Sequence, residues 1–195
     1  MENKIDFFNK LAERWDENDI VDSEKYRRII KFLRLKEKDK ILDVGTGTGV
    51  LIPYVLEVEK NVWIFAIDIA EKMIDKLKSK NFPKNVSPFI MDICKTSYKE
   101  NFFDKIIANA CFPHFDNKKM ALKEIYRILK KDGIFVISHP IGREYVNEIH
   151  KKYYPVENDI LEDIKTLKKF VEGFGFELIE GIDEKDFFIV VFKKL

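Results

Sequence analysis

Five apolar runs of strand length alternate with helical patterns along most of the chain, and this alternation constrains the fold more than any other feature. The runs predict strands at 40–44, 62–68, 86–92, 103–110 and 133–139. The spacing of apolar residues between the runs predicts helices at 50–58, 70–79 and 117–130. Strands joined in turn by helices form crossovers, so the pattern predicts a parallel sheet with helices on both faces.

The two ends of the chain depart from this alternation. Apolar residues at helical spacing predict a helix over 5–17, and a second helix is expected to follow the Asp22-Ser23 cap as far as Leu33. Near the carboxyl terminus, apolar runs at 176–180 and 187–193 are separated by a short polar stretch, which is typical of a hairpin. We therefore expect a doubly wound α/β fold: a seven-stranded sheet, mostly parallel with a C-terminal antiparallel hairpin, plus N-terminal helices.

Length and charge limit the domain count and the class of partner. A chain of 195 residues is expected to form one domain, 1–195, with a helical cap at 1–38 and a lid or insert at 140–175. Lys and Arg number 35 against 34 Asp and Glu, so neither nucleic acid nor a membrane surface is an expected partner. Cys94 and Cys111 lack a CxxC spacing, and no signal-peptide pattern is seen, so a cytoplasmic location is expected.

A glycine-rich loop follows the first predicted strand and precedes a helix. The loop reads Gly45-Thr46-Gly47-Thr48-Gly49, where glycines permit a tight turn and let a ligand approach the backbone. Asp68 ends the second strand, 23 positions after Gly45, where its carboxylate can accept hydrogen bonds from ribose hydroxyls. Asp92 ends the third strand. Two acids and a glycine loop at the same sheet edge predict a nucleoside site.

The details of the loop distinguish between nucleoside cofactors. The third glycine of a dinucleotide pattern would fall at position 50, which is Val50. Asp43 precedes the loop, where a negative charge disfavours a pyrophosphate and suits an ammonium group. A nucleoside with an amino-acid end is therefore favoured. Two alternatives stay open: a nicotinamide-dinucleotide oxidoreductase, and a non-catalytic domain that binds a cofactor or a partner.

Three segments resemble motifs of a known family, the class I S-adenosylmethionine-dependent methyltransferases, and in particular its small ubiquinone/menaquinone-methylase-like branch. Residues 41–49 resemble its first motif, 66–73 its second-strand segment and 121–133 the helix and turn before its fifth strand. The resemblance implies a Rossmann-like fold and transfer of a methyl group to an O, N, S or C atom of a small-molecule acceptor. S-adenosylhomocysteine would be the product. We expect a monomer or a homodimer.

The resemblance also implies roles for individual residues. Asp68 would hold the ribose and Asp92 the adenine amino group. Gly45 and Gly47 would hold the methionine part. Asn109, with the alanine that follows it, would line the floor near the methyl group. The complete set of expected cofactor-binding residues is Asp43, Gly45, Thr46, Gly47, Asp68, Ile69, Met73, Asp92, Ile93, Asn109 and Trp15. For Trp15, packing over the cofactor and a plain core position are both open.

Methyl transfer from a sulfonium is an in-line displacement, so alignment and water exclusion are the main contributions of the protein. A base is needed only when the nucleophile arrives protonated, and histidine suits that task. The candidates are His114, His139 and His150, each in a segment expected to frame the acceptor. No metal site is expected, because His and Cys lack the close paired spacing of such sites.

A polar face is predicted on the helix that follows the fifth strand. Arg143, Asn147 and His150 recur at intervals of four and three, which places them on one side of a helix. Turned inward, this face would form a polar patch opposite the methyl donor; turned outward, it would be a solvated surface. We expect residues 139–154 to close the acceptor side of the pocket.

Overall fold

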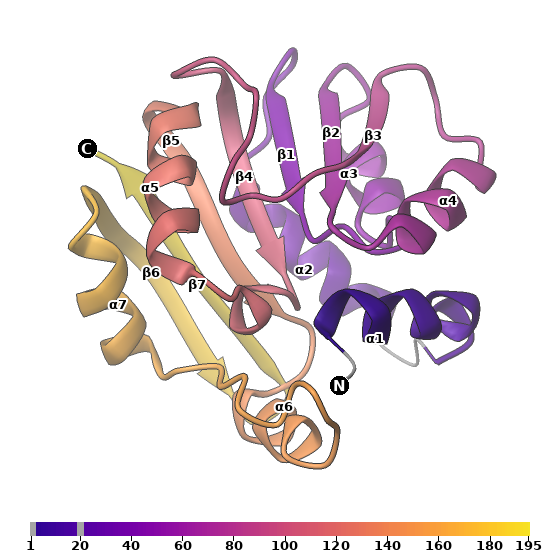
Figure 1. Ribbon diagram of the computed structural model, residues 1–195. Coiled ribbons are helices and arrows are strands. Elements are labelled where there is room, and N and C mark those ends of the chain that lie inside the picture. The colour runs from indigo at the N-terminus through magenta and orange to yellow at the C-terminus, as the bar shows by residue number, and fades with distance from the viewer. Residues whose placement is uncertain (1–2, 19–21) are drawn as a thin grey trace.

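Seven strands form one sheet in the order β3-β2-β1-β4-β5-β7-β6 in the computed structural model, which describes residues 3–18 and 22–195 (Figure 1). The strands are β1 (Lys40–Val44), β2 (Trp63–Asp68), β3 (Val86–Ile90), β4 (Phe103–Asn109), β5 (Leu129–His139), β6 (Phe176–Glu184) and β7 (Phe187–Lys194). Strands β1 to β5 are parallel, and β7 lies antiparallel between β5 and β6. The predicted sheet, with its antiparallel hairpin, is confirmed.

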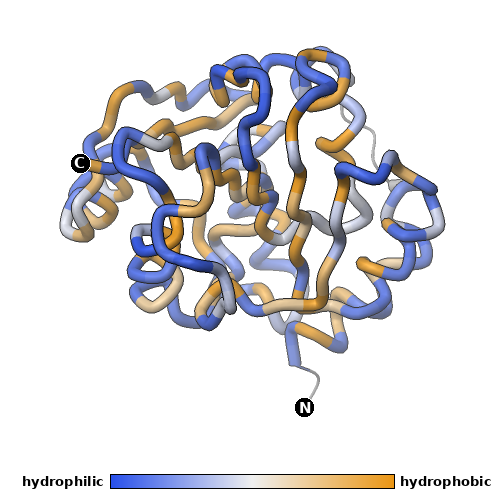
Figure 2. Tube along the Cα trace, turned by 90° about the horizontal axis from the view of Figure 1, so that it is seen from above, coloured by the Kyte–Doolittle hydropathy of each residue, from blue (hydrophilic) through white to orange (hydrophobic). Residues whose placement is uncertain are grey.

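The central strands are apolar on both faces, which is why helices must cover both. In β1, Ile41, Leu42 and Val44 are each at most 2% exposed, although they point alternately to opposite sides. The inner hairpin strand β7 is likewise buried from Phe187 to Phe192. Hydrophobic colour follows the strands through the middle of the molecule, while hydrophilic colour follows the outer helices and loops (Figure 2).

Helices pack on the two faces through apolar stripes. The helices are α1 (Lys4–Leu11), α2 (Ser23–Leu33), α3 (Ile52–Val58), α4 (Glu71–Ser79), α5 (Lys118–Ile128), α6 (Arg143–His150) and α7 (Ile164–Glu172). Three short 3-10 turns span Ala12–Arg14, Asp16–Asn18 and Phe112–His114. In α2 the buried residues are Tyr26, Ile29, Ile30 and Leu33, at helical spacing. Side chains of α2 and α3 belong to the core on one face of the sheet, and those of α5 and α7 to the core on the other.

The structure corrects several predicted boundaries. Strand β6 continues to Glu184 instead of ending at 180, because its polar end still pairs with β7 while its other edge faces solvent. Strand β5 begins at Leu129, which pairs with Phe103 across a register shift, so α5 ends at Ile128. The amino-terminal helix stops at Leu11 and gives way to 3-10 turns, instead of running to 17.

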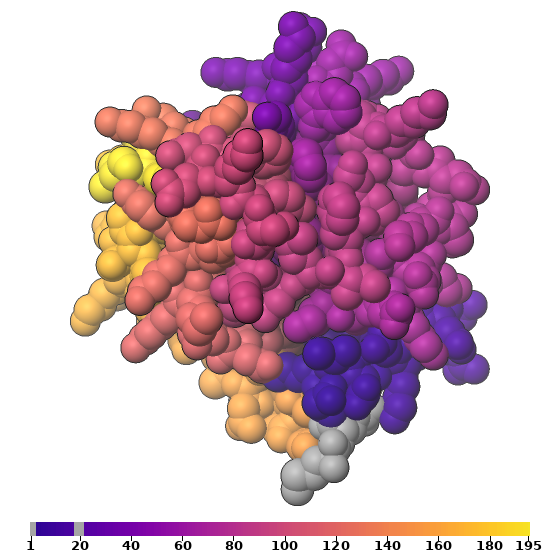
Figure 3. Space-filling model, turned by 45° about the horizontal axis from the view of Figure 1, so that its top comes forward, coloured from indigo at the N-terminus to yellow at the C-terminus, as the bar shows by residue number. Residues whose placement is uncertain are grey.

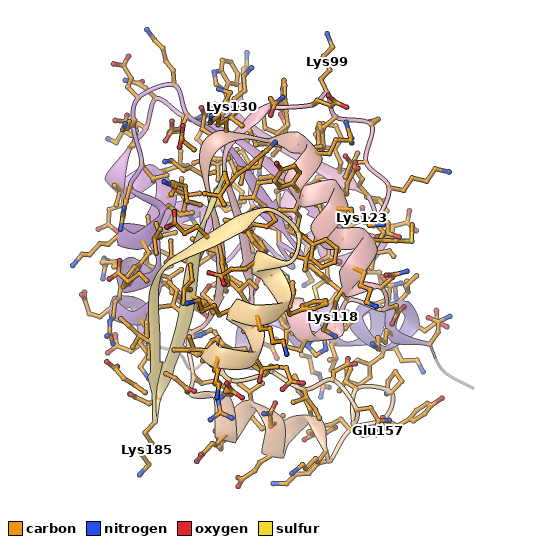
Figure 4. The ribbon with its side chains drawn as sticks, turned by 90° about the vertical axis from the view of Figure 1, so that its left-hand side faces the viewer. Lys99, Lys118, Lys123, Lys130, Glu157 and Lys185 are labelled. Carbon is orange, nitrogen blue, oxygen red and sulfur yellow. The ribbon has the colours of Figure 1, made fainter. Side chains whose placement is uncertain are left out.

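One helix was missed in the range 140–175. Helix α7 lies within it and buries Leu167 and Val171 against the sheet, so this half of the range is the crossover into β6. In Figure 4, α7 lies next to α5, and Lys185 marks the tip of the β6–β7 turn at the same end of the molecule as α6. At that end, a Cβ atom built on Gly142 would lie 1.9 Å from the carbonyl oxygen of Lys185, so the chain can pass the hairpin tip only at a glycine.

The arrangement brings the chain's amino-terminal part to the edge where β1 to β5 end. Helices α1 and α6 both lie at that edge, at the bottom of Figure 1. In the space-filling view, the indigo amino-terminal segment lies against both magenta atoms and the orange atoms of the segment after β5 (Figure 3). Residues 1–2 and 19–21 of the expected cap, 1–38, lie outside the described residues. Within the described segments, no helix is long and apolar enough to cross a membrane.

Candidate functional site

The glycine loop leaves β1 in a conformation that only glycine adopts easily. Gly45, Gly47 and Gly49 have φ values of +61°, +56° and +83°. A Cβ atom on Gly45 would also lie 2.5 Å from the Cβ of Cys111, so this position is closed to any side chain. The corresponding atom on Gly47 would have nothing closer than the Trp15 Nε1, at 3.7 Å. A Cβ atom at Gly47 would therefore make only ordinary van der Waals contacts, with no clash.

Asp43 lies at the buried end of β1, directly under the loop. It is 5% exposed, and its Oδ2 accepts a hydrogen bond from the Thr46 hydroxyl at 2.6 Å. Burial raises the pKa of Asp43 to about 7, and the nearby charge of Asp68 adds to the shift. A cation that reached this carboxylate would stabilise its ionised form, so the position suits an ammonium group.

Asp68 links the end of β2 to the glycine loop. Its Oδ2 accepts the Gly47 N–H at 2.9 Å, and its Oδ1 accepts the Ala70 N–H at 2.8 Å. Burial raises the pKa of Asp68 despite these hydrogen bonds, which act in the opposite direction. Each carboxylate oxygen keeps a second lone pair, so both can still accept a hydroxyl proton.

Asp92 follows β3 in a more open setting. Its side chain is exposed, and Oδ1 accepts the Cys94 N–H at 2.8 Å, which fixes one oxygen and leaves the other to solvent. Ile93 beside it is 5% exposed, and Met73 on α4 is 2% exposed. Ile69, 44% exposed, lies at the end of β2. These apolar side chains and the acid make a wall suited to a flat, partly polar ring.

Two adjoining cavities surround the glycine loop. The larger, about 350 Å³, includes Asp68, Ile69, Met73, Asp92, Ile93 and His114 in its wall. The smaller, about 230 Å³, includes Asp43, Thr46, Tyr26, Asn109, His139 and Pro140. Both are lined by Trp15, Gly45, Gly47 and Ala110, so they adjoin on the two sides of the loop. Every expected cofactor-binding residue lies in one wall or the other.

The amino-terminal segment closes the site from outside. The Asn9 side chain accepts the Lys72 N–H at 3.0 Å, and Asp16 hydrogen-bonds the Thr48 hydroxyl and pairs with Lys80 at 2.9 Å. Trp15, between these anchors, is half-buried and packs with Phe8 and Met73, so the two interpretations offered for it are compatible.

The floor between the cavities carries backbone strain. Ala110 has φ of +54°, an uncommon value for a residue with a side chain, and its N–H donates to the Ser138 carbonyl at 2.8 Å. Asn109 is 8% exposed, and its Oδ1 accepts the Ser138 hydroxyl at 3.0 Å. These bonds join the ends of β4 and β5 and hold the strained residue in place.

The three histidines lie close together but in different settings. His139 lines the smaller cavity, its Nδ1 accepts the Ile141 N–H at 3.4 Å, and burial lowers its pKa to about 3. His114 lines the larger cavity. His150 is 8% exposed and lines neither cavity, but its ring lies 4.7 Å from that of His114.

The predicted polar face of α6 is only partly turned inward. His150 is buried, and Asn147 hydrogen-bonds both backbone groups of Leu161, at 2.8 and 3.0 Å. Arg143 instead turns to Asp183 on β6, at 2.7 Å. Asn147 therefore attaches α6 to the segment that follows it, and Arg143 attaches α6 to β6. Of the three residues of this face, His150 is the one that contacts a residue of the cavity wall, His114.

Sequence reasoning missed Asp159 and the role of Lys4. Asp159 is 7% exposed and bonds both His114 and Lys4, at 2.8 Å each. No sequence signal marks it, because its partners are 45 and 155 positions away. Within the described segments, no three His, Cys, Asp or Glu side chains are grouped as metal ligands.

Comparisons with known proteins agree with this geometry. Residues 42–137 match a family model described as a methyltransferase domain. A malonyl-[acyl-carrier protein] O-methyltransferase of Acetivibrio thermocellus is 30% identical over 94% of this chain and 72% of its own length. One from Bacillus cytotoxicus is 29% identical over 75% of this chain; the match spans 52% of that protein, about half its length.

Solved structures show the same fold. A S-adenosylmethionine-dependent methyltransferase of Aquifex aeolicus superposes over the whole of both chains with a TM-score of 0.75 and 22% identity. A candidate methyltransferase, in complex with a Haloferax volcanii methyltransferase activator, gives a TM-score of 0.81 over 99% of this chain and 98% of its own, with 15% identity.

Proposed function

The chain belongs to the class I S-adenosylmethionine-dependent methyltransferases, and we propose that its two adjoining cavities hold the methyl donor around the glycine loop. Enzymes of this family transfer the methyl group of S-adenosylmethionine and release S-adenosylhomocysteine. The observation that carries the proposal is the common cavity wall, which brings Asp43, Gly47, Asp68 and Asp92 to one sheet edge under Trp15.

Each part of the donor has a matching part of the wall. The ammonium group binds at the buried carboxylate of Asp43, and the methionine chain runs along the backbone of Gly45, Thr46 and Gly47. The ribose hydroxyls donate to Asp68, whose oxygens are already oriented by backbone N–H groups.

The adenine and the methyl group occupy the two sides of this path. Adenine lies against Ile69, Met73 and Ile93, with its amino group donating to Asp92. The methyl group points to the floor at Asn109 and Ala110, where an in-line approach of the acceptor is shielded from water by Trp15.

The acceptor is a small molecule whose nucleophile is an O, N, S or C atom. The near balance of 35 basic and 34 acidic residues gives no field to attract nucleic acid. The protein acts in the cytoplasm as a monomer or homodimer. The carrier-bound acceptor in the names of the relatives, and the activator bound to a structural neighbour, belong to those proteins.

Titration calorimetry with S-adenosylhomocysteine tests the donor site. Asp68→Ala is expected to weaken binding by roughly 10- to 100-fold, since hydrogen bonds to a charged group contribute about 1.5–3 kcal/mol. Asp75→Ala, an exposed acid on the neighbouring helix α4, is the matched control and is expected to bind like the wild type. Equal affinity of the two variants refutes the ribose assignment.

The two alternatives give different results in the same assay. Tighter binding of a nicotinamide dinucleotide than of S-adenosylhomocysteine would favour an oxidoreductase. Binding of S-adenosylhomocysteine without transfer of labelled methyl groups to a broad set of acceptors would favour a non-catalytic, cofactor-sensing domain. If S-adenosylhomocysteine does not bind at about millimolar concentration, the proposed function is refuted.

A further inference from the structure

His114 is held in the cavity wall by two ring contacts. Its ring centroid lies 5.1 Å from that of Phe8 on α1 and 4.7 Å from that of His150 on α6. The side chain keeps 14% of its surface exposed, and it borders the larger cavity. The imidazole is therefore fixed in orientation and still open to a bound molecule.

Asp159 determines which ring nitrogen of His114 carries the proton. Its Oδ2 lies 2.8 Å from His114 Nδ1, and its Oδ1 lies 2.8 Å from Lys4 Nζ. Burial alone raises the pKa of Asp159, but the hydrogen bonds from His114 and Lys4 outweigh it and the pKa is lowered. An ionised carboxylate only accepts, so Nδ1 donates and the lone pair of the neutral ring is on Nε2.

Asp159 is itself held by α6. The Nδ1–H of His150 donates to the Asp159 backbone carbonyl. Two residues later, the Asn147 side chain forms hydrogen bonds with both the backbone carbonyl and the backbone N–H of Leu161. In residues 3–18 and 22–195, no hydrogen bond is formed to Nε2 of His114. Asp159 is thus held in position, His114 is held in one tautomer, and the lone pair on His114 Nε2 has no partner among the described residues.

The charges around this cavity disfavour an anionic acceptor. Lys4 is the one cation in the described part of the larger cavity's wall, and it is neutralised by Asp116 at 2.9 Å and Asp159 at 2.8 Å. Asp68 and Asp92 add negative charge to the same wall. Among the described side chains of this wall, a carboxylate acceptor would find no unpaired positive group, and only the sulfonium of the bound donor would attract it. A neutral acceptor would need a base to remove its proton.

We propose that His114 and Asp159 form a proton-accepting pair, and that the acceptor is a neutral molecule with an O–H, N–H or S–H nucleophile. This rests on the proposed function. His114 Nε2 takes the proton as the nucleophile forms its bond to the methyl carbon. The carbon–sulfur bond breaks, its electron pair stays on sulfur, and S-adenosylhomocysteine leaves as a neutral thioether. The positive charge passes to the imidazolium, which Asp159 stabilises until the proton returns to water.

The environment keeps this base neutral before the reaction. Burial lowers the pKa of His114 from its ordinary value, against the hydrogen bond that His114 donates to Asp159, which raises it. The other titratable groups that face the ring are Lys4 from α1 and His150 from α6, with His139 from β5 nearby. Asp159 acts as a positioning residue, because it reaches the acceptor only through His114.

Nitrogen NMR of the histidines tests the pair without any acceptor. In the protein loaded with S-adenosylhomocysteine, His114 is expected to be the Nδ1–H tautomer, and Asp159→Asn is expected to shift its titration or mix its tautomers. Asp186→Asn is the matched control, because Asp186 also pairs with a lysine, Lys25 at 2.8 Å, but is exposed and lines neither cavity. An Nε2–H tautomer in the wild type overturns the proposal.

Transfer of labelled methyl groups tests the acceptor class. The neutral probes are catechol, 2-mercaptoethanol and aniline; the anionic probes are benzoate, malonate and malonyl-[acyl-carrier protein]. We expect transfer to a neutral probe, with kcat lowered about 100-fold or more in His114→Gln and less in Asp159→Asn, at nearly unchanged KM and with a shifted pH profile.

Three results oppose the inference. They are preferential transfer to the anionic probes, normal kcat in both variants, and no transfer to any neutral probe while S-adenosylhomocysteine still binds. Failure of S-adenosylhomocysteine to bind would instead refute the proposed function. Asp186→Asn is expected to keep the wild-type kcat and pH profile, which separates the pair from a general effect of removing an ion pair with a lysine.

Discussion

The donor side and the acceptor side of the candidate site are built in different ways. On the donor side, Asp43, Asp68 and Asp92 lie at or just beyond the carboxyl ends of β1, β2 and β3. The backbone N–H groups of Gly47 and Ala70 hold Asp68 in place. On the acceptor side, Lys4 and Asp159 meet across 155 positions, through side chains of helices and loops. The sheet itself thus places the donor side, whereas the acceptor side depends on how distant segments pack.

A substitution at Gly45, the glycine of the loop with the closest neighbouring atoms, is expected to have the largest effect on stability and donor binding. Gly45→Ala combines a positive φ with a clash against Cys111, and should cost roughly 2–4 kcal/mol of unfolding free energy and abolish S-adenosylhomocysteine binding. Gly47→Ala meets only the φ penalty and should cost about 1–2 kcal/mol. Urea unfolding and calorimetry measure both; equal stability of the two variants contradicts the packing argument.

Changing the buried acid at the donor side should reveal a pH dependence. The pKa of Asp43 in the folded protein is about 7, above its ordinary value, so ionising it costs stability as pH rises from about 4 to 7. Asp43→Asn should be more stable than the wild type at pH 8 by roughly 2–4 kcal/mol.

The same substitution should remove a pH effect on binding. In the wild type, affinity for S-adenosylhomocysteine should fall as pH drops below about 7, because protonated Asp43 cannot pair with the ammonium group. Calorimetry at pH 6 and pH 8 measures this. A flat wild-type profile, or an equally steep profile in Asp43→Asn, would contradict it.

A substitution on the acceptor side should leave donor binding intact. Asn147→Ala removes both hydrogen bonds to Leu161 and should cost roughly 1–2 kcal/mol of stability. Because this loosens the segment that carries Asp159, turnover of a protonated acceptor should fall while S-adenosylhomocysteine affinity stays the same. Glu148→Ala, an exposed neighbour, is the control. Weakened donor binding in Asn147→Ala would show that the two sides are not separable.

Trp15 touches both sides and should give the smallest effect. Trp15→Ala is expected to weaken S-adenosylhomocysteine binding roughly fivefold, because losing part of a half-buried apolar contact costs about 1 kcal/mol. The other tryptophan, Trp63, is 50% exposed at the start of β2 and is the control. In Trp63→Phe, ligand-dependent fluorescence should report on Trp15 alone, and a signal unchanged by ligand would place Trp15 away from the donor.

The sequence by itself determined the sheet and its antiparallel hairpin, and it placed the residues that we propose for the donor at one edge of that sheet. These follow from local signals. Strand-length apolar runs must be buried on both faces. Asp43, Gly45, Asp68 and Asp92 stand at or just after the ends of strands that a parallel sheet brings to one edge. Their positions along the chain therefore imply their positions in space.

Only the tertiary structure decided the acceptor side. The spacing of Arg143, Asn147 and His150 predicted a shared helix face. In the fold, however, Arg143 pairs with Asp183 of the hairpin, and the ring of His150 packs against that of His114. Asp159 has no motif at all, and its place depends on the packing of α6 and α1 at the sheet edge. Contacts between side chains far apart in sequence leave no period or spacing to read, because they arise from the fold as a whole.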